Sequence, residues 1–273
     1  MTIATIDECF ARAEREGRPV FVAYLPVGFP SVEESLRCAH AALDAGADLL
    51  ELGVPFSDPS ADGPVIAKAS YEAIAAGGSL RAALQVARSL RERHSAPIVL
   101  FSYYNPVVAF GEERLPGAMV EAGVDGILIV DLPPDEGEIL RQGAKAENLA
   151  VIPLLAPTSG SEREAAILSS ASGFIYYVSV TGVTGSAAAP LEEAGRHAAE
   201  LTAKSGLPVV VGFGIDSVEK AQQVARVGAR GLVVGTGIVR AIDGARGGDP
   251  AAAVGRLVAE LRSGLSTSST AAR

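Results

Sequence analysis

The stretch LLELGVPFSDPSADGPVIAKAS, residues 49–70, decides the fold, because it joins a buried strand to a helix through an acidic loop. Its first residues form a short apolar run that is interrupted by a single carboxylate, Glu51. Gly53 and Pro55 end the strand, and Pro64 suits the first position of the following helix. A buried carboxylate is costly unless it is protonated or finds donors. We therefore interpret Glu51 as a functional acid, with a structural ion pair at the strand end as the alternative.

Short apolar runs rich in Val, Ile and Leu recur along the chain and alternate with segments of helical period. Continuous apolar runs indicate strands buried on both faces, and strand–helix alternation indicates parallel βαβ units. The runs span residues 20–25, 48–52, 97–103, 125–132, 150–156, 174–180, 207–214 and 231–236. Eight such units in about 250 residues fit an α/β fold of the (β/α)8 TIM-barrel type better than a doubly wound sheet.

No linker or shift in composition divides the chain, so residues 1–263 are expected to form a single TIM-barrel domain. Residues 2–16 are amphipathic and charged, and we expect them to form an additional N-terminal helix that covers the barrel floor. The sequence GLSTSSTAAR, residues 264–273, is small and polar and is expected to be a flexible C-terminal tail.

Charge and hydropathy exclude several classes of function. A net charge of −9 argues against a nucleic-acid partner, although backbone amides can still bind a phosphorylated metabolite. No apolar run reaches the roughly 18 residues of a membrane span, and the N-terminus lacks the apolar core of a signal peptide. Cys9 and Cys38 fall in helical patterns and are interpreted as inert fillers rather than a disulfide or a metal pair. We expect a cytoplasmic protein that does not bind membranes.

The chemistry of a TIM barrel is expected at the C-terminal ends of its strands. The lysines and histidines all fall in predicted helices, so a Schiff-base lysine is not expected at the barrel mouth. No group of His, Asp and Glu has metal-ligand spacing, and we expect no metal site. Acid–base chemistry by carboxylates remains.

The other polar residues expected at the barrel mouth can each be interpreted in more than one way. Asp62 precedes Gly63-Pro64, so helix capping and a substrate role are equally supported. Asp58 is interpreted as a turn former, and Asp131 as a brace of the barrel mouth. Tyr176 ends the sixth strand, where it either fills the barrel or uses its hydroxyl in the site.

Glycine turns follow the seventh and eighth strands, which is the usual phosphate site of such barrels. Gly212 and Gly214 allow close approach of the backbone, and Gly235 and Thr236 precede a short helix whose free amides face an anion. Tight turns alone are the alternative. The glycine-rich segment 179–190 is a candidate lid, or else an ordinary surface loop.

Several motifs, taken together, resemble the tryptophan synthase alpha chain family. They occur in the family's order and spacing from about Phe21 to Val239: ELGVPFSDPSADGP, FSYYNPV, GVDGILIVDLP, GVTG, GFGI and VVGTGIV. The resemblance implies a cofactor-free lyase that cleaves indole-3-glycerol phosphate into indole and glyceraldehyde 3-phosphate by a retro-aldol reaction.

The resemblance also implies roles for individual residues. Glu51 matches the general acid/base of the family, Asp62 the carboxylate that binds the indole N–H, and Tyr176 the tyrosine beside Glu51. The phosphate site is matched by Phe213, Gly214, Gly235 and Thr236. The lid is matched by Gly182, Thr184 and Gly185.

The same resemblance implies a partner, a beta chain that carries pyridoxal phosphate and receives indole within an alpha2-beta2 complex. Three departures from the family pattern stand out. Thr236 replaces the usual Ser and keeps a hydroxyl, and Pro26 replaces a common Thr. Ala67-Lys68 replaces a polar pair on the segment that faces the partner in the family.

Three alternatives to this function remain open. A free-standing lyase would release indole without a beta chain. A sugar-phosphate isomerase would need an Asp or Cys pair across the barrel mouth. A catalytically inactive barrel would only bind and activate a partner, which the presence of Glu51 and Asp62 argues against.

Overall fold

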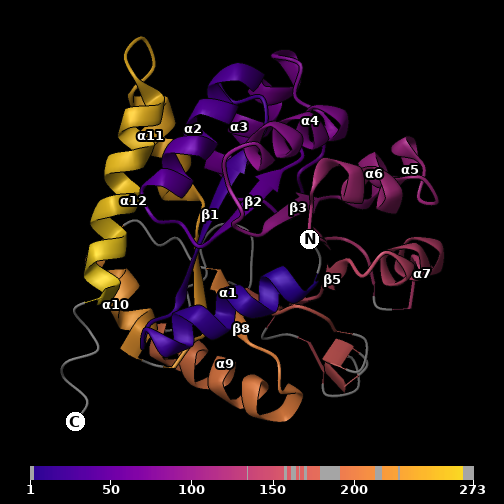
Figure 1. Ribbon diagram of the computed structural model, residues 1–273, viewed down its shortest axis with the longest axis vertical. Helices are drawn as coiled ribbons and strands as arrows, with labels where there is room; N and C mark the ends of the chain where they lie inside the picture. The colour runs from indigo at the N-terminus through magenta and orange to yellow at the C-terminus, as the bar shows by residue number, and fades with distance from the viewer. Residues whose placement is uncertain are drawn as a thin grey trace.

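The computed structural model describes residues 3–133, 135–156, 159–160, 164–165, 167–168, 171–178, 191–212, 217–226 and 228–266. Nine parallel strands form one sheet in the order β5-β4-β3-β2-β1-β9-β8-β7-β6. The strands are β1 (Val20–Pro26), β2 (Leu49–Gly53), β3 (Ile98–Ser102), β4 (Gly126–Ile129), β5 (Ala150–Ile152), β6 (Leu154–Leu155), β7 (Ile175–Val178), β8 (Val209–Gly212) and β9 (Gly231–Val234). The predicted TIM-barrel fold is confirmed, since these strands form a nearly closed barrel inside a layer of helices (Figure 1).

The fifth predicted strand, residues 150–156, is divided at Pro153. β5 pairs with β4, whereas β6 pairs with β7 on the other side of the barrel wall. Proline has no N–H to donate to a neighbouring strand, but the Pro153 carbonyl accepts a hydrogen bond of 3.0 Å from Tyr176 N. The ring of strands therefore passes from β4 to β7 through two short pieces instead of one continuous strand.

The helices follow the predicted pattern with two additions. Ser31 and Ser79 cap their helices by accepting hydrogen bonds from Glu34 N and Ala82 N. The helices are α1 (Ile3–Arg15), α2 (Val32–Asp44), α3 (Pro64–Ala75), α4 (Leu80–Arg91), α5 (Tyr104–Phe110), α6 (Leu115–Ala122), α7 (Glu138–Ala146), α9 (Leu191–Ser205), α10 (Val218–Arg226), α11 (Thr236–Gly244) and α12 (Pro250–Ser266). The two additions are α5 and α12, which the sequence analysis did not predict. α12 includes residues 264–266 of the expected tail, and the rest of that tail lies outside the described residues.

The N-terminal helix closes one end of the barrel, as predicted. α1 buries Ile6, Cys9, Phe10 and Ala13, and the Phe10 ring lies 5.6 Å from that of Phe174 inside the barrel. Figure 1 shows α1 lying across the strands at this end. The burial of these apolar side chains stabilises the floor of the barrel. The active sites of TIM barrels lie at the opposite end, where the strands have their C-termini.

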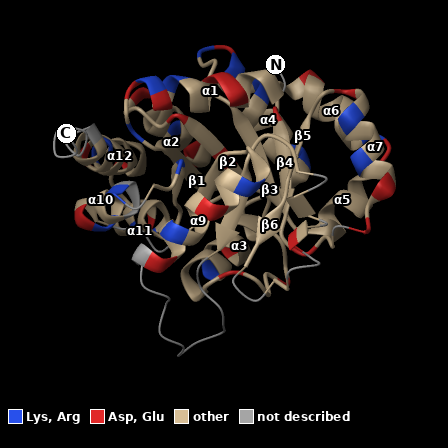
Figure 2. Cartoon of the chain, turned by 90° about the horizontal axis from the view of Figure 1, so that it is seen from below, with Lys and Arg blue, Asp and Glu red and all other residues tan. Residues whose placement is uncertain are grey.

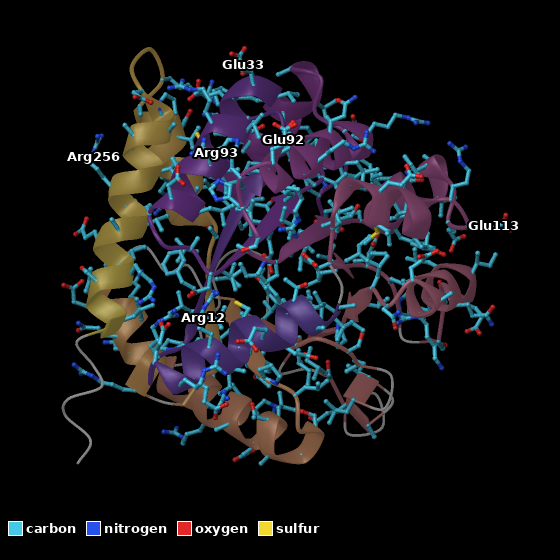
Figure 3. The ribbon with its side chains drawn as sticks, viewed as in Figure 1. Arg12, Glu33, Glu92, Arg93, Glu113 and Arg256 are labelled. Carbon is cyan, nitrogen blue, oxygen red and sulfur yellow. The ribbon has the colours of Figure 1, made fainter. Side chains whose placement is uncertain are left out.

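Alternation along β2 separates an outer core from an inner one. Leu50 and Leu52 pack outward against the helices, whereas Leu49 packs inside the barrel. The charged side chains gather on the outer helices (Figure 2), and Glu33, Glu113 and Arg256 project from the periphery (Figure 3). No helix in the described ranges is long and apolar enough to cross a membrane. Both cysteines, Cys9 and Cys38, are buried and free.

Candidate active site

Glu51 lies inside the barrel, because it is two residues after the inward-facing Leu49 and side chains alternate along a strand. Its neighbours in register are Tyr24 on β1 and Val99 on β3. The side chain is fully buried, and neither carboxyl oxygen has a hydrogen-bond partner among the described residues. Burial raises the pKa of Glu51 to about 8. The group is therefore a protonated carboxylic acid at neutral pH, and it forms no ion pair with any described residue.

A cavity of about 150 Å³ opens at the C-terminal ends of the strands. Its lining comes from six different segments of the chain. These residues are Tyr24, Asp62, Ile66, Phe101, Tyr176, Gly212, Val233, Gly235 and Thr236. Five of the residues predicted for the site, Asp62, Tyr176, Gly212, Gly235 and Thr236, are thus brought together around one space.

Electrostatics connect Glu51 with this cavity. The pKa of Tyr24 and the pKa of Tyr176 are both raised well above 10, first by burial and then by the charges of Glu51 and Asp62. Both phenols therefore remain protonated at neutral pH. Tyr24 belongs to the site as much as the predicted Tyr176 does.

Aromatic rings build one wall of the cavity. The Phe101 ring lies 5.3 Å from Tyr24 at 78° and 6.1 Å from Tyr176 at 61°, which are edge-to-face arrangements. Ile66 and Val233 add aliphatic surface. Such a wall suits a flat apolar ligand, while the two carboxyl groups supply the polar contacts.

Asp62 does not cap the following helix. The N-cap of α3 is Gly63, and no side chain caps that helix, so the capping interpretation is wrong. Asp62 Oδ2 instead accepts a hydrogen bond of 3.2 Å from the Tyr103 hydroxyl. Burial raises the pKa of Asp62 to about 6, against a lowering by the Tyr103 bond. Asp62 is consequently a carboxylate at neutral pH, opposite in protonation to Glu51, as suits an acid and an electrostatic stabiliser in one site.

The first turn of α11 supplies the candidate anion cradle. Gly235 precedes the helix and Thr236 is its first residue. Val239 N donates to Gly235 O at 2.9 Å, and the preceding amides of a first turn have no partner within the helix. These amides and the helix dipole favour an anion. Phe213 and Gly214, the other predicted phosphate contacts, lie outside the described residues.

Gly212 lines the cavity and also leaves room for a tyrosine. A Cβ at Gly212 would lie 2.5 Å from Tyr176 Oη, and a Cβ at Gly53 would lie 2.5 Å from Tyr24 Oη. The two phenols therefore occupy space that only glycine leaves free at the ends of β2 and β8. The sequence analysis interpreted Gly212 only as a glycine that lets the backbone approach a phosphate. It did not predict the contact with Tyr176, because that contact depends on which side chain of the neighbouring strand faces Gly212.

Of the remaining predicted residues, Asp131 and Asp58 are described by the structure and the lid residues are not. Asp131 is exposed and its Oδ1 accepts a hydrogen bond of 2.7 Å from Tyr104 N at the start of α5, so its bracing role is confirmed. Asp58 is exposed in the loop, where its carbonyl accepts from Ser60 N at 2.8 Å. The lid residues Gly182, Thr184 and Gly185 lie outside the described part of the chain.

Tyr24, Phe101 and Tyr103 are site residues to which the sequence analysis assigned no role. Each lies at the C-terminal end of a predicted strand, and that position was the signal that could have identified them. In the portion of the chain that the structure describes, no group of three His, Cys, Asp or Glu side chains is arranged to hold a metal ion.

Known proteins are similar to this chain in both sequence and fold. The family model for the tryptophan synthase alpha chain matches residues 10–264. The tryptophan synthase alpha chain of Dechloromonas aromatica (strain RCB) is 42% identical over 264 residues, which cover 96% of this chain and 98% of the relative. That of Citrifermentans bemidjiense is 41% identical over 263 residues, with coverage of 96% and 98%.

Solved structures agree with this match. Tryptophan synthase subunit alpha from Legionella pneumophila str. Paris superposes with a TM-score of 0.89 at 34% identity, covering 98% of this chain and 99% of the other. A chain of M. tuberculosis tryptophan synthase in its aminoacrylate-bound form gives 0.86 at 31% identity, with 96% and 99% covered. The chain therefore belongs to the tryptophan synthase alpha chain family, lyases of tryptophan biosynthesis.

Proposed function

We propose that the protein cleaves indole-3-glycerol phosphate into indole and glyceraldehyde 3-phosphate by a retro-aldol reaction that needs no cofactor in this chain. The observation that carries the proposal is the pair of carboxyl groups. Glu51 is buried without a partner among the described residues and has a pKa of about 8. Asp62 lines the cavity at the C-terminal ends of the strands and has a pKa of about 6. One acid and one carboxylate are thus available together between these two values.

Glu51 would act first as an acid and then as a base. Its proton goes to C3 of the indole ring, which makes the ring a cation. The bond between C3 and the first glycerol carbon then breaks, and its electron pair passes into the ring and neutralises the nitrogen. The hydroxyl on that carbon loses its proton to the Glu51 carboxylate and becomes the aldehyde carbonyl. Glu51 is then protonated again, ready for the next substrate.

Asp62 would accept a hydrogen bond from the indole N–H. Its negative charge stabilises the positive charge that grows on the nitrogen when C3 is protonated. The rings of Tyr24, Phe101 and Tyr176 flank the apolar part of the cavity, where the indole would lie. Tyr176 would keep water away from Glu51.

The phosphate group would bind at the start of α11. Thr236 and the amides that follow Gly235 supply donors without a basic side chain, and Phe213 and Gly214 would complete the cradle. Gly182, Thr184 and Gly185 would belong to a loop that covers the bound substrate.

The partner in this proposal is a tryptophan synthase beta chain in an alpha2-beta2 complex. That chain would carry pyridoxal phosphate and condense the released indole with serine. Support comes from a hollow of about 390 Å³ at the rim, lined by Phe56, Ile74 and Phe110 among others, and from the exposure of Tyr71 and Val108 beside it. Exposed apolar patches of this kind mark interaction surfaces. Two buried free thiols are consistent with a reducing, cytoplasmic compartment.

Two measurements test the proposal. The purified chain is assayed for indole release from indole-3-glycerol phosphate, alone and with a beta chain. Large activation by the partner supports the complex, whereas full activity alone supports the free-standing lyase. Glu51→Gln should abolish cleavage and leave substrate binding by calorimetry intact. Undiminished turnover in that variant would remove Glu51 from the mechanism.

A further inference from the structure

Tyr103 is held rigidly beside the site by its own backbone. It follows β3 directly, is the N-cap residue of α5, and is 3% exposed. Ser102 Oγ donates to its carbonyl at 2.8 Å, and Asp131 fixes the amide of the next residue. The ring therefore contacts the β2–α3 loop from the junction between β3 and α5, where hydrogen bonds hold the backbone on both sides of its Cα.

The Tyr103 side chain contacts that loop at three points. Ala61 N donates to Tyr103 Oη at 3.0 Å, and Tyr103 Oη donates its own proton to Asp62 Oδ2 at 3.2 Å. The ring packs against Phe56 with centroids 5.1 Å apart at 33°. Within the described ranges, no other hydrogen bond from a side chain reaches the Asp62 carboxylate.

From this geometry we infer that Tyr103 is a positioning residue that aims the Asp62 carboxylate into the cavity and keeps it ionised. The inference rests on the proposed function, since it gives Tyr103 a role through Asp62 and none of its own at the substrate. The hydroxyl uses its single proton on Asp62 and accepts from Ala61, so one phenol fixes both the direction of the carboxylate and the backbone that carries it. A hydrogen bond to the charged form favours that form.

The chain offers a matched control in the next residue. The Tyr104 phenol donates to Glu112 on the outside of the barrel mouth and lines no part of the cavity around Asp62. Tyr103→Phe and Tyr104→Phe each remove one hydroxyl and keep the ring, so packing against Phe56 survives in the first variant.

The experiment measures pH profiles of kcat and kcat/KM for indole-3-glycerol phosphate with the wild type and both variants. Tyr103→Phe should lower kcat/KM about tenfold, which equals about 1.4 kcal/mol, and should move the acid limb upward by about one pH unit. Tyr104→Phe should do neither. In Tyr103→Phe/Asp62→Asn, kcat/KM should equal that of Asp62→Asn alone, because the hydroxyl acts through Asp62. An unmoved acid limb, or losses that add in the double variant, would overturn the inference.

A second readout separates this inference from the proposed function. The Asp62 pKa is followed by ¹³C NMR of labelled carboxyl groups in wild type, Tyr103→Phe and Tyr104→Phe, without substrate. A rise in the Asp62 pKa that is confined to Tyr103→Phe supports the positioning role of Tyr103. This holds even if the wild type fails to cleave indole-3-glycerol phosphate, and in that case only the proposed function fails. An Asp62 pKa that is the same in all three proteins overturns the positioning role of Tyr103 and leaves the proposed function intact.

Discussion

Tyr176 Oη lies over the α-carbon of Gly212, so close that a Cβ added to that glycine would be 2.5 Å from the oxygen. The contact joins neighbouring strands, since Tyr176 on β7 and Gly212 on β8 end at the same rim. Tyr176 is almost fully buried and lines the cavity, so the open space beside its ring is the cavity itself. The size of one residue therefore sets the position of an aromatic ring on the cavity wall.

Gly212→Ala should push the Tyr176 ring into the substrate space. We expect kcat/KM to fall about a hundredfold or more, since small misplacements at a site have effects of that order. The measurement is steady-state kinetics with indole-3-glycerol phosphate. Gly117→Ala is the control: Gly117 is within α6, with nothing within 4 Å of an added Cβ, and this variant should keep full activity. Wild-type kinetics in Gly212→Ala would contradict the steric argument.

Activity should be highest between about pH 6 and about pH 8. Asp62, with its pKa raised to about 6 by burial, must be ionised, so activity is lost as the pH falls through that value. Glu51, with its pKa raised to about 8 by burial, must be protonated, so activity is lost as the pH rises through that value. The test is the pH dependence of kcat/KM, which reports the ionisable groups of the free enzyme. In Asp62→Asn the acid limb should disappear, and its persistence would assign that limb to another group.

The burial of Glu51 should make the protein less stable as the pH rises. Its pKa is raised from 4.5 to about 8 in the folded chain, so the folded state binds more protons than the unfolded state between these values. The free energy of unfolding should therefore fall across this window, by an amount on the order of 4 kcal/mol from this one group. Urea unfolding across the window measures the change. Glu51→Gln should flatten it, and an equal slope in that variant would indicate a different ionisable group.

The floor helix should contribute strongly to stability. Phe10 is 5% exposed and packs against Phe174, so Phe10→Ala leaves a cavity between α1 and the barrel. We expect a loss of about 3–5 kcal/mol in the free energy of unfolding, measured with urea. Glu8→Ala, at an exposed position of the same helix, should cost less than about 1 kcal/mol. Similar losses in both variants would mean that α1 does not pack as described.

The amino-acid sequence was enough to predict the barrel and to select Glu51 as a functional acid. Both follow from local rules, because apolar runs and glycine turns mark strands and loops, and a lone carboxylate in a buried strand is costly. The carboxyl ends of parallel strands then meet at one rim. The resemblance to a known family assigned roles to Asp62 and Tyr176, and the family match is confirmed.

Only the tertiary structure decided how the site is held together. Tyr103 and Asp62 are 41 residues apart in the chain, and the pairing of Tyr176 with Gly212 also joins separate strands. The split at Pro153 depends on which neighbours β5 and β6 meet across the closing barrel. The local pattern of apolar and polar residues indicates which face of a helix or strand is buried. It does not indicate which distant side chain will lie against that face. Packing between elements makes that choice, because it follows from the shapes of all the residues around the site together.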